Sequence, residues 1–179
     1  MDLNLPNKLT LLRVFLIPVF IYFYLASPFP EPFSVYAALA VFLAAAATDA
    51  LDGYIARKYN LTTNFGKLMD PLADKLLVVS AMIAMVQTEL FPSWAAIVIV
   101  AREFLITGFR TVAAERGIII AASFTAKIKT ASQIVMTAVL LLNISEILNC
   151  VFIWVAVILT VVSAVEYIVK NKSVIYDKP

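Results

Sequence analysis

The stretch that decides the fold of this chain is DALDGYIARKYNLTTNFGKLMDPLAD, residues 49–74. In a sequence that is otherwise strongly apolar, it holds four carboxylates: Asp49, Asp52, Asp70 and Asp74. Asp49 and Asp52 are three residues apart, so on a helix they share one face. Gly66, Asp70 and Asp74 are spaced four and four, which predicts a second stripe on the following helix. We expect two helices, joined by a short polar turn, to direct both carboxylate pairs toward one place.

Carboxylates gathered in apolar surroundings need balancing charges. Four of them cannot share such a site unless protons or cations neutralise them. The chain has no histidine, and its single cysteine, Cys150, is far away in the sequence and is predicted to be a small apolar residue without a disulfide partner. A site made only of oxygen ligands favours Mg²⁺, Mn²⁺ or Ca²⁺ over zinc.

The composition is that of a membrane protein. Of the 179 residues, 63% are hydrophobic, and the mean hydropathy is +0.94. A soluble domain is nearer half apolar, so this chain would have too little polar surface to face water. Its length is enough for about six spans of roughly 20 residues each.

Breaks in the apolar pattern divide the chain into six segments. Three prolines within 27–32 cannot continue a helix, and polar turns follow at 60–64, 88–93 and 143–146. Pro71 predicts a bend or a late helix start in the third segment. The fold class is therefore all-α, a polytopic membrane protein forming one domain over residues 1–179. The predicted spans cover residues 9–26, 34–58, 65–87, 94–115, 123–142 and 148–169.

Charge placement predicts the orientation in the membrane. All fourteen lysines and arginines fall in the N-terminal region, between 57 and 75, between 102 and 129, or near the C-terminus. The turns at 27–32, 88–93 and 143–146 hold none and carry one glutamate each. The positive-inside rule therefore places both termini, and the site built from residues 49–74, on the cytoplasmic side.

The motif resembles the signature of the CDP-alcohol phosphotransferase family of membrane lipid-synthesis enzymes. The shared pattern is Asp-x2-Asp-Gly-x2-Ala-Arg-x8-Gly-x3-Asp-x3-Asp, and its fixed positions are Asp49, Asp52, Gly53, Ala56, Arg57, Gly66, Asp70 and Asp74. The resemblance implies transfer of a phosphate-linked lipid group from a CDP-lipid to an alcohol. It assigns two divalent cations, Mg²⁺ or Mn²⁺, to the four aspartates, and it makes Asp74 the candidate general base.

The same resemblance implies a binding surface for the CDP-lipid. That surface would include Asn7, Thr10, Gly53, Ala56, Arg57 and Gly66. Other interpretations of these positions stay open. Asn7 could cap the first helix, Arg57 could extend to the membrane interface, and Gly66 could serve close helix packing. Arg13, one turn into the first segment, could contact the nucleotide or likewise extend to the interface.

Two stretches in the second half narrow the acceptor alcohol. AREFLITGFR, residues 101–110, and KIKT, residues 127–130, resemble bacterial phosphatidylglycerophosphate synthases, a branch of the family whose acceptor is glycerol 3-phosphate. A phosphorylated acceptor needs cations, and the candidates are Arg102, Arg110, Lys127 and Lys129. Arg102 could instead form a structural ion pair with Glu103. Ala126 stands where the resemblance leads us to expect glycine.

Several alternatives remain open on the sequence alone. Within the family, the acceptor could be that of a cardiolipin, phosphatidylserine or phosphatidylinositol phosphate synthase. From another class, a divalent-cation transporter also uses intramembrane carboxylates, but it does not need Gly53, Ala56 and Arg57 at fixed offsets. An inactive homologue is disfavoured because all four aspartates are present. The expected partners are CDP-diacylglycerol, glycerol 3-phosphate, the lipid bilayer of a bacterial plasma membrane and, by resemblance, a second copy of the chain; no nucleic acid is expected.

Overall fold

The computed structural model describes residues 5–59, 64–115 and 123–171, and these residues form helices and turns without any strand. The α-helices of the described residues are α1 (Leu5–Ile21), α2 (Phe33–Tyr59), α3 (Asn64–Gln87), α4 (Ser93–Glu115), α5 (Phe124–Leu142) and α6 (Glu146–Lys170). The predicted all-α class is confirmed, and each helix covers one of the predicted segments to within a few residues.

The helix ends follow from local chemistry. Pro18 lies inside α1 and cannot donate a backbone hydrogen bond, and a π-helical segment, Tyr22–Ala26, follows it. The Ser123 side chain accepts a 3.2 Å hydrogen bond from the Ala126 amide and thereby caps the start of α5. Asn143 ends α5 in the left-handed conformation, with φ of 44°.

Pro71 does not delay the start of its helix. The sequence predicted a bend or a late helix start there, but α3 begins at Asn64 and continues through position 71. The late start is therefore wrong, and the bend stays a prediction.

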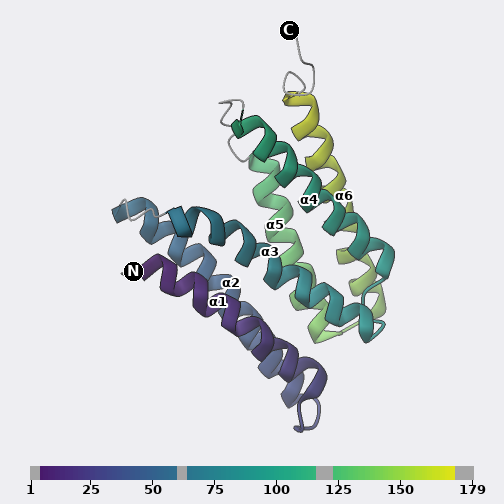
Figure 1. The fold of residues 1–179 in the computed structure, drawn as a ribbon. Helices are drawn as coiled ribbons and strands as arrows, with labels where there is room; N and C mark the ends of the chain where they lie inside the picture. The colour runs from purple at the N-terminus through teal and green to yellow at the C-terminus, as the bar shows by residue number, and fades with distance from the viewer. Residues whose placement is uncertain (1–4, 60–63, 116–122, 172–179) are drawn as a thin grey trace.

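The helices alternate in direction along the chain (Figure 1). The start of α1, the end of α2, the start of α3 and the ends of α4 and α6 lie toward the left and top of the view, and the turns that join α1 to α2, α3 to α4 and α5 to α6 lie toward the bottom and right. Helix α1 packs on α2 and α3, whereas α6 packs on α4 and α5. Helix α3 also contacts α4 and α5, so it joins the two groups and brings the aspartate-bearing helices next to the cation-bearing ones.

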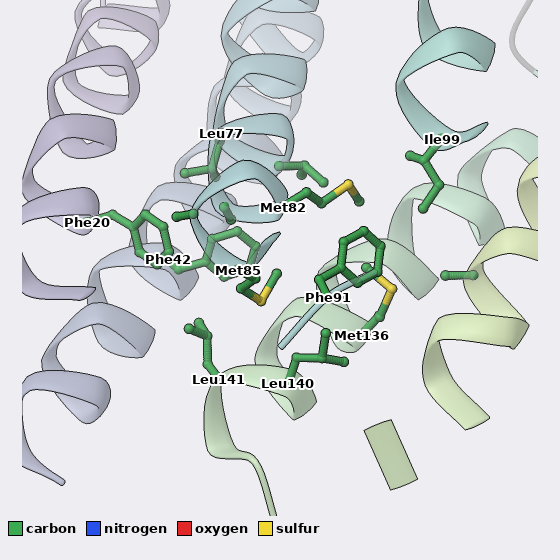
Figure 2. Close-up of a cluster of buried hydrophobic side chains, with 14 of the residues drawn as sticks. Phe20, Phe42, Leu77, Met82, Met85, Phe91, Ile99, Met136, Leu140 and Leu141 are labelled. Atoms are coloured by element: carbon green, nitrogen blue, oxygen red, sulfur yellow. The ribbon is translucent and has the colours of Figure 1, made fainter. Parts of the chain in front are cut away.

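A buried apolar cluster fixes this arrangement. Its side chains come from α1, α2, α3, α4, α5 and α6 and from the turn before α4, and Figure 2 shows how they converge. The labelled members are Phe20, Phe42, Leu77, Met82, Met85, Phe91, Ile99, Met136, Leu140 and Leu141. Dispersion between close-packed side chains is the main attraction available to helices whose other faces meet lipid.

Polar side chains join α5 to α6. Gln133 Nε2 donates a 3.1 Å hydrogen bond to Thr160 Oγ1, and both residues are buried. Thr160 also donates to the carbonyl oxygen of Ala156, and Ser163 to that of Thr160. Such hydrogen bonds satisfy polar groups that lipid cannot, so they add directional contacts to the packing of the two helices.

The outer surface identifies a membrane protein. Large apolar side chains such as Phe15, Phe104, Phe124 and Ile147 are mostly exposed, which a surface facing water does not tolerate in such numbers. Residues Asn7–Ala26, helix α5 and helix α6 are long and apolar enough to cross a membrane. Among the described side chains, helices α2 and α3 hold the shorter apolar stretches Phe33–Asp49 and Lys75–Gln87.

Candidate active site

A hollow of about 450 Å³ opens between α2, α3, α4, α5 and α6. It brings together side chains that lie far apart in the sequence, including an aspartate of the motif and the four predicted cations. The lining residues are Asp49, Lys75, Arg102, Glu103, Ile106, Thr107, Arg110, Ala126, Lys127, Lys129, Thr130, Ala131, Ile134 and Tyr167. Asp49 of the motif and the four predicted cations of the second half therefore line one cavity.

An ion pair between α1 and α2 stands beside this hollow. Arg13 Nη1 lies 3.0 Å from Asp49 Oδ1. The Arg13 side chain is fully buried, whereas the Asp49 side chain is 42% exposed. Arg13 therefore does not extend to the membrane interface, which the sequence had left open, and it places a positive charge against one carboxylate of the motif.

Asn7, Thr10 and Arg13 form one polar face of α1. They follow one another at intervals of three residues, and all three are buried. Because Arg13 reaches Asp49, this face is turned toward the aspartate-bearing end of α2. The contact of Asn7 and Thr10 with the nucleotide stays a prediction.

Glu103 neutralises the two most deeply placed cations of the hollow. Its Oε1 accepts a hydrogen bond of 3.2 Å from Arg102 Nη1 and a second one from Lys129 Nζ. Arg102 Nη2 also donates to Ser163 Oγ on α6, at 3.1 Å. Arg102 and Lys129 are both buried, and a buried cation without a countercharge is costly. The ion pair between Arg102 and Glu103, which the sequence had left open as an alternative, is therefore present in the structure, and Lys129 also pairs with Glu103.

Arg110 and Lys127 have a different environment in the same hollow. Both are exposed, and neither forms an ion pair with a carboxylate in the described ranges. Arg110 is on α4, two turns beyond Arg102, and Lys127 is in the first turn of α5. Their positive charges are therefore the ones that an anionic ligand entering the hollow would meet first.

Lys75 and Thr107 connect α3 to this charge network. Lys75 Nζ donates to Thr107 Oγ1, and Thr107 Oγ1 donates to the Glu103 carbonyl oxygen at 2.6 Å. Sequence reasoning did not assign a site role to Lys75, Glu103, Thr107 or Tyr167. Lys75 directly follows Asp74, so its place beside the motif could have indicated a role in the site. Nothing in the sequence around Thr107 or Tyr167 indicates such a role.

The remaining motif residues are placed only through their helices. Asp52, Gly53, Ala56 and Arg57 lie in α2, and Gly66, Asp70 and Asp74 lie in α3, but their side chains are outside the described part of the chain. Helices α2 and α3 contact each other, as the two-stripe prediction requires. Among side chains that are described, no three potential metal ligands form a group.

Comparison with known proteins gives one consistent result. The sequence profile of the family described as CDP-alcohol phosphatidyltransferase matches residues 3–162. A protein of Bacillus subtilis (strain 168), named CDP-diacylglycerol--glycerol-3-phosphate 3-phosphatidyltransferase, is 48% identical, with 94% of this chain and 95% of that protein aligned. Proteins with the same name from Rickettsia felis and Shigella flexneri are 36% and 38% identical, with at least 93% of each chain aligned.

The central role of Glu103 can be tested by removing its charge. We expect Glu103→Gln to lower the free energy of unfolding by about 3 kcal/mol, because Arg102 and Lys129 lose the carboxylate that balances them in a buried position. The measurement is the unfolding temperature of purified protein in detergent micelles, which should fall by roughly 6 °C or more.

Glu115→Gln is the matched control for that experiment. Glu115 is an exposed carboxylate at the end of the same helix, so its variant should stay within about 0.5 kcal/mol of the unsubstituted chain. Equal unfolding temperatures for the two variants would contradict the neutralising role of Glu103.

Proposed function

The chain belongs to the CDP-alcohol phosphatidyltransferase family, and we propose that it transfers a phosphatidyl group from CDP-diacylglycerol to glycerol 3-phosphate. In this reaction the acceptor hydroxyl oxygen forms a new bond to the phosphorus that carries the lipid. The bond from that phosphorus to CMP breaks, and the products are phosphatidylglycerol phosphate and CMP. The single observation that carries the proposal is the hollow in which Asp49 of the motif meets the acceptor-side cations.

The charge of the hollow favours a phosphorylated acceptor. Five cationic side chains line it, Lys75, Arg102, Arg110, Lys127 and Lys129, against the carboxylates of Asp49 and Glu103 among its lining residues. Glu103 offsets part of the charge of Arg102 and Lys129, which leaves Arg110 and Lys127 facing the open volume. A phosphate accepts hydrogen bonds from both kinds of cation, whereas a neutral alcohol would leave their charges without a partner.

Arg110 and Lys127 are therefore the principal candidates for the acceptor phosphate. Arg102 and Lys129 stay in the proposed site, but each already has a carboxylate partner in this structure. In this proposal, Arg102 and Lys129 supply fixed positive charge to the buried part of the hollow. Glu103 is accordingly a positioning residue, since it acts through the two cations it binds.

The donor set of the motif fits divalent cations. It consists of carboxylates only, from Asp49 and Asp52 on α2 and from Asp70 and Asp74 on α3, and oxygen ligands suit Mg²⁺ and Mn²⁺. These four residues would hold two such ions. When bound, the ions would neutralise the diphosphate of the CDP-lipid and stabilise the leaving group.

The protein's own groups have separate tasks in this proposal. Asp74 takes the proton of the attacking hydroxyl, as the resemblance to the family suggests. Arg13 holds Asp49 through their 3.0 Å ion pair and limits the freedom of that carboxylate. Asn7, Thr10, Gly53, Ala56, Arg57 and Gly66 form the surface for the CDP-lipid. Positioning and charge neutralisation account for most of the catalysis of such transfers, which is the kind of help these residues offer.

The membrane arrangement completes the proposal. We infer six membrane-spanning helices in a single domain, residues 1–179, with both termini and the active site on the cytoplasmic side of the plasma membrane. The alternation of helix directions supports this arrangement, and so does the absence of lysine and arginine from the turns at 27–32, 88–93 and 143–146. A substrate with its tail in the bilayer could then present its head group to the hollow. Assembly as a homodimer rests on the family resemblance alone.

The experiment that tests the function is CMP release by purified protein in detergent micelles. Each reaction contains CDP-diacylglycerol, Mg²⁺ or Mn²⁺ and one acceptor: glycerol 3-phosphate, serine, inositol phosphate or phosphatidylglycerol. We expect release with glycerol 3-phosphate only, abolished by a chelator and restored by added metal. Release with another acceptor would keep the family chemistry and reject the acceptor assignment, and absence of release from folded protein would favour a transporter or an inactive homologue.

The metal assignment predicts the effect of two substitutions in α3. Asp70→Asn and Asp74→Asn should each abolish CMP release while the protein still folds, because a metal ligand or the general base is lost. Asn is nearly the same size as Asp, so the change is mainly one of charge and metal affinity. Activity near that of the unsubstituted chain in either variant, measured at saturating metal, would reject the assignment.

The acceptor assignment predicts a selective effect at Lys127. We expect Lys127→Ala to raise the KM for glycerol 3-phosphate about tenfold, the loss of roughly 1.4 kcal/mol, with a much smaller change for CDP-diacylglycerol. The matched control is Lys170→Ala, since Lys170 is an exposed lysine paired with Glu166 on α6 and does not line the hollow. Equal increases for both substrates in the Lys127 variant would indicate a general structural effect.

A further inference from the structure

Tyr167 on α6 lines the same hollow, and its hydroxyl is buried. Its side chain is 4% exposed, and it is one of the lining residues. The hydroxyl oxygen has no hydrogen-bond partner among the described residues. Burying a hydroxyl without a partner is costly, so the tyrosine needs an explanation beyond packing.

The ring itself is held firmly in place. Phe109 on α4 packs edge-on against it, with 5.8 Å between ring centroids and 79° between the ring planes. At the backbone, the Tyr167 carbonyl oxygen accepts hydrogen bonds from the Asn171 amide and from the Asn171 side chain, at 3.2 and 2.8 Å. A phenylalanine would make the same ring contacts without the cost of the unpaired hydroxyl, so packing alone does not explain the tyrosine.

The surroundings indicate which ligand group the hydroxyl would meet. Arg102 and Arg110 line the same hollow as Tyr167. Arg102 is engaged by Glu103 and Ser163, and Arg110 faces the open volume. An anion bound to Arg110 would therefore lie next to a hydroxyl that needs an acceptor. Phosphate oxygens are acceptors, and a neutral donor beside a cation fixes their orientation without adding charge.

We propose that the Tyr167 hydroxyl donates a hydrogen bond to the phosphate of the acceptor substrate, beside Arg110, and so contributes to selection of a phosphorylated alcohol. This inference rests on the proposed function, because it names a further binding residue of the same site. Tyr167 takes no part in bond making or breaking. Among the described residues the Tyr167 hydroxyl has no acceptor, and an incoming phosphate would supply one.

Tyr167→Phe tests the inference because it removes one oxygen atom and keeps the ring. In the CMP-release assay we expect the KM for glycerol 3-phosphate to rise about tenfold, as for the loss of one hydrogen bond to a charged group. The kcat and the KM for CDP-diacylglycerol should stay within about twofold, since the interaction is confined to acceptor binding. Without glycerol 3-phosphate, the unfolding temperature should be unchanged or higher, because an unpaired buried group has been removed.

Tyr24→Phe is the matched control. Its hydroxyl lies 2.7 Å from Thr88 Oγ1, and it lines a different hollow, so its loss should leave the KM for glycerol 3-phosphate unchanged.

The inference is overturned if the KM for glycerol 3-phosphate does not change in the Tyr167 variant. It is also overturned if the KM values for glycerol 3-phosphate and CDP-diacylglycerol rise equally, or if only the KM for CDP-diacylglycerol rises. A fall in the unfolding temperature measured without acceptor would show that the hydroxyl has a structural partner, which overturns it too. If the unsubstituted chain releases no CMP with glycerol 3-phosphate, the proposed function itself fails, and that result is read in the same assay before any variant is compared.

Discussion

Charged side chains inside an apolar helical bundle must be neutralised, and the neutralising contacts of this protein occur where its helices meet. Glu103 binds Arg102 on its own helix and Lys129 on α5, and Arg102 in turn reaches Ser163 on α6. Three helices are thereby joined around one carboxylate. In the same way, an ion pair between Arg13 and Asp49 joins α1 to α2. Because each pair would be costly to separate in low-dielectric surroundings, the contacts restrict how these helices can be placed.

The apolar core and the polar network hold the helices together by different kinds of contact. The cluster that includes Phe42, Met82 and Leu140 packs α1 to α6 together, and its members have no directional preference of their own. The charge network is directional, because a guanidinium or an ammonium must meet its carboxylate at hydrogen-bond distance. Where charged contacts replace apolar packing between the helices, the bundle holds a hollow with a fixed polar lining. Such a combination suits an enzyme whose substrate has both a lipid tail and a charged head.

The site separates cations that support the structure from cations that remain available. Lys127 and Lys129 are two residues apart on α5, yet Lys127 is exposed and Lys129 is 3% exposed and bound to Glu103. Sequence reasoning placed both at the acceptor phosphate, since residue type and spacing do not distinguish them. The difference comes from the orientation of α5 relative to α4. The same holds for Tyr167: the sequence shows a tyrosine near the end of an apolar helix, but it does not predict what surrounds the hydroxyl.

The sequence by itself determined the all-α class, the positions of the turns at 27–32, 88–93 and 143–146, the membrane character and the family; the predicted turn at 60–64 lies mostly outside the described residues. Those properties depend on local features: the length of apolar runs, prolines and polar residues in the turns, and aspartates spaced to share a helix face. The late helix start expected near Pro71 was wrong, because α3 as a whole continues through a residue that locally disfavours a helix. Only the tertiary structure decided that Arg13 pairs with Asp49, that Glu103 joins two cations, and that Asp49 lines the same hollow as the cations of the second half of the chain. These contacts join different helices or depend on how a helix is turned in the bundle, and the packing of whole helices, not the spacing of residues along one of them, sets which side chains meet.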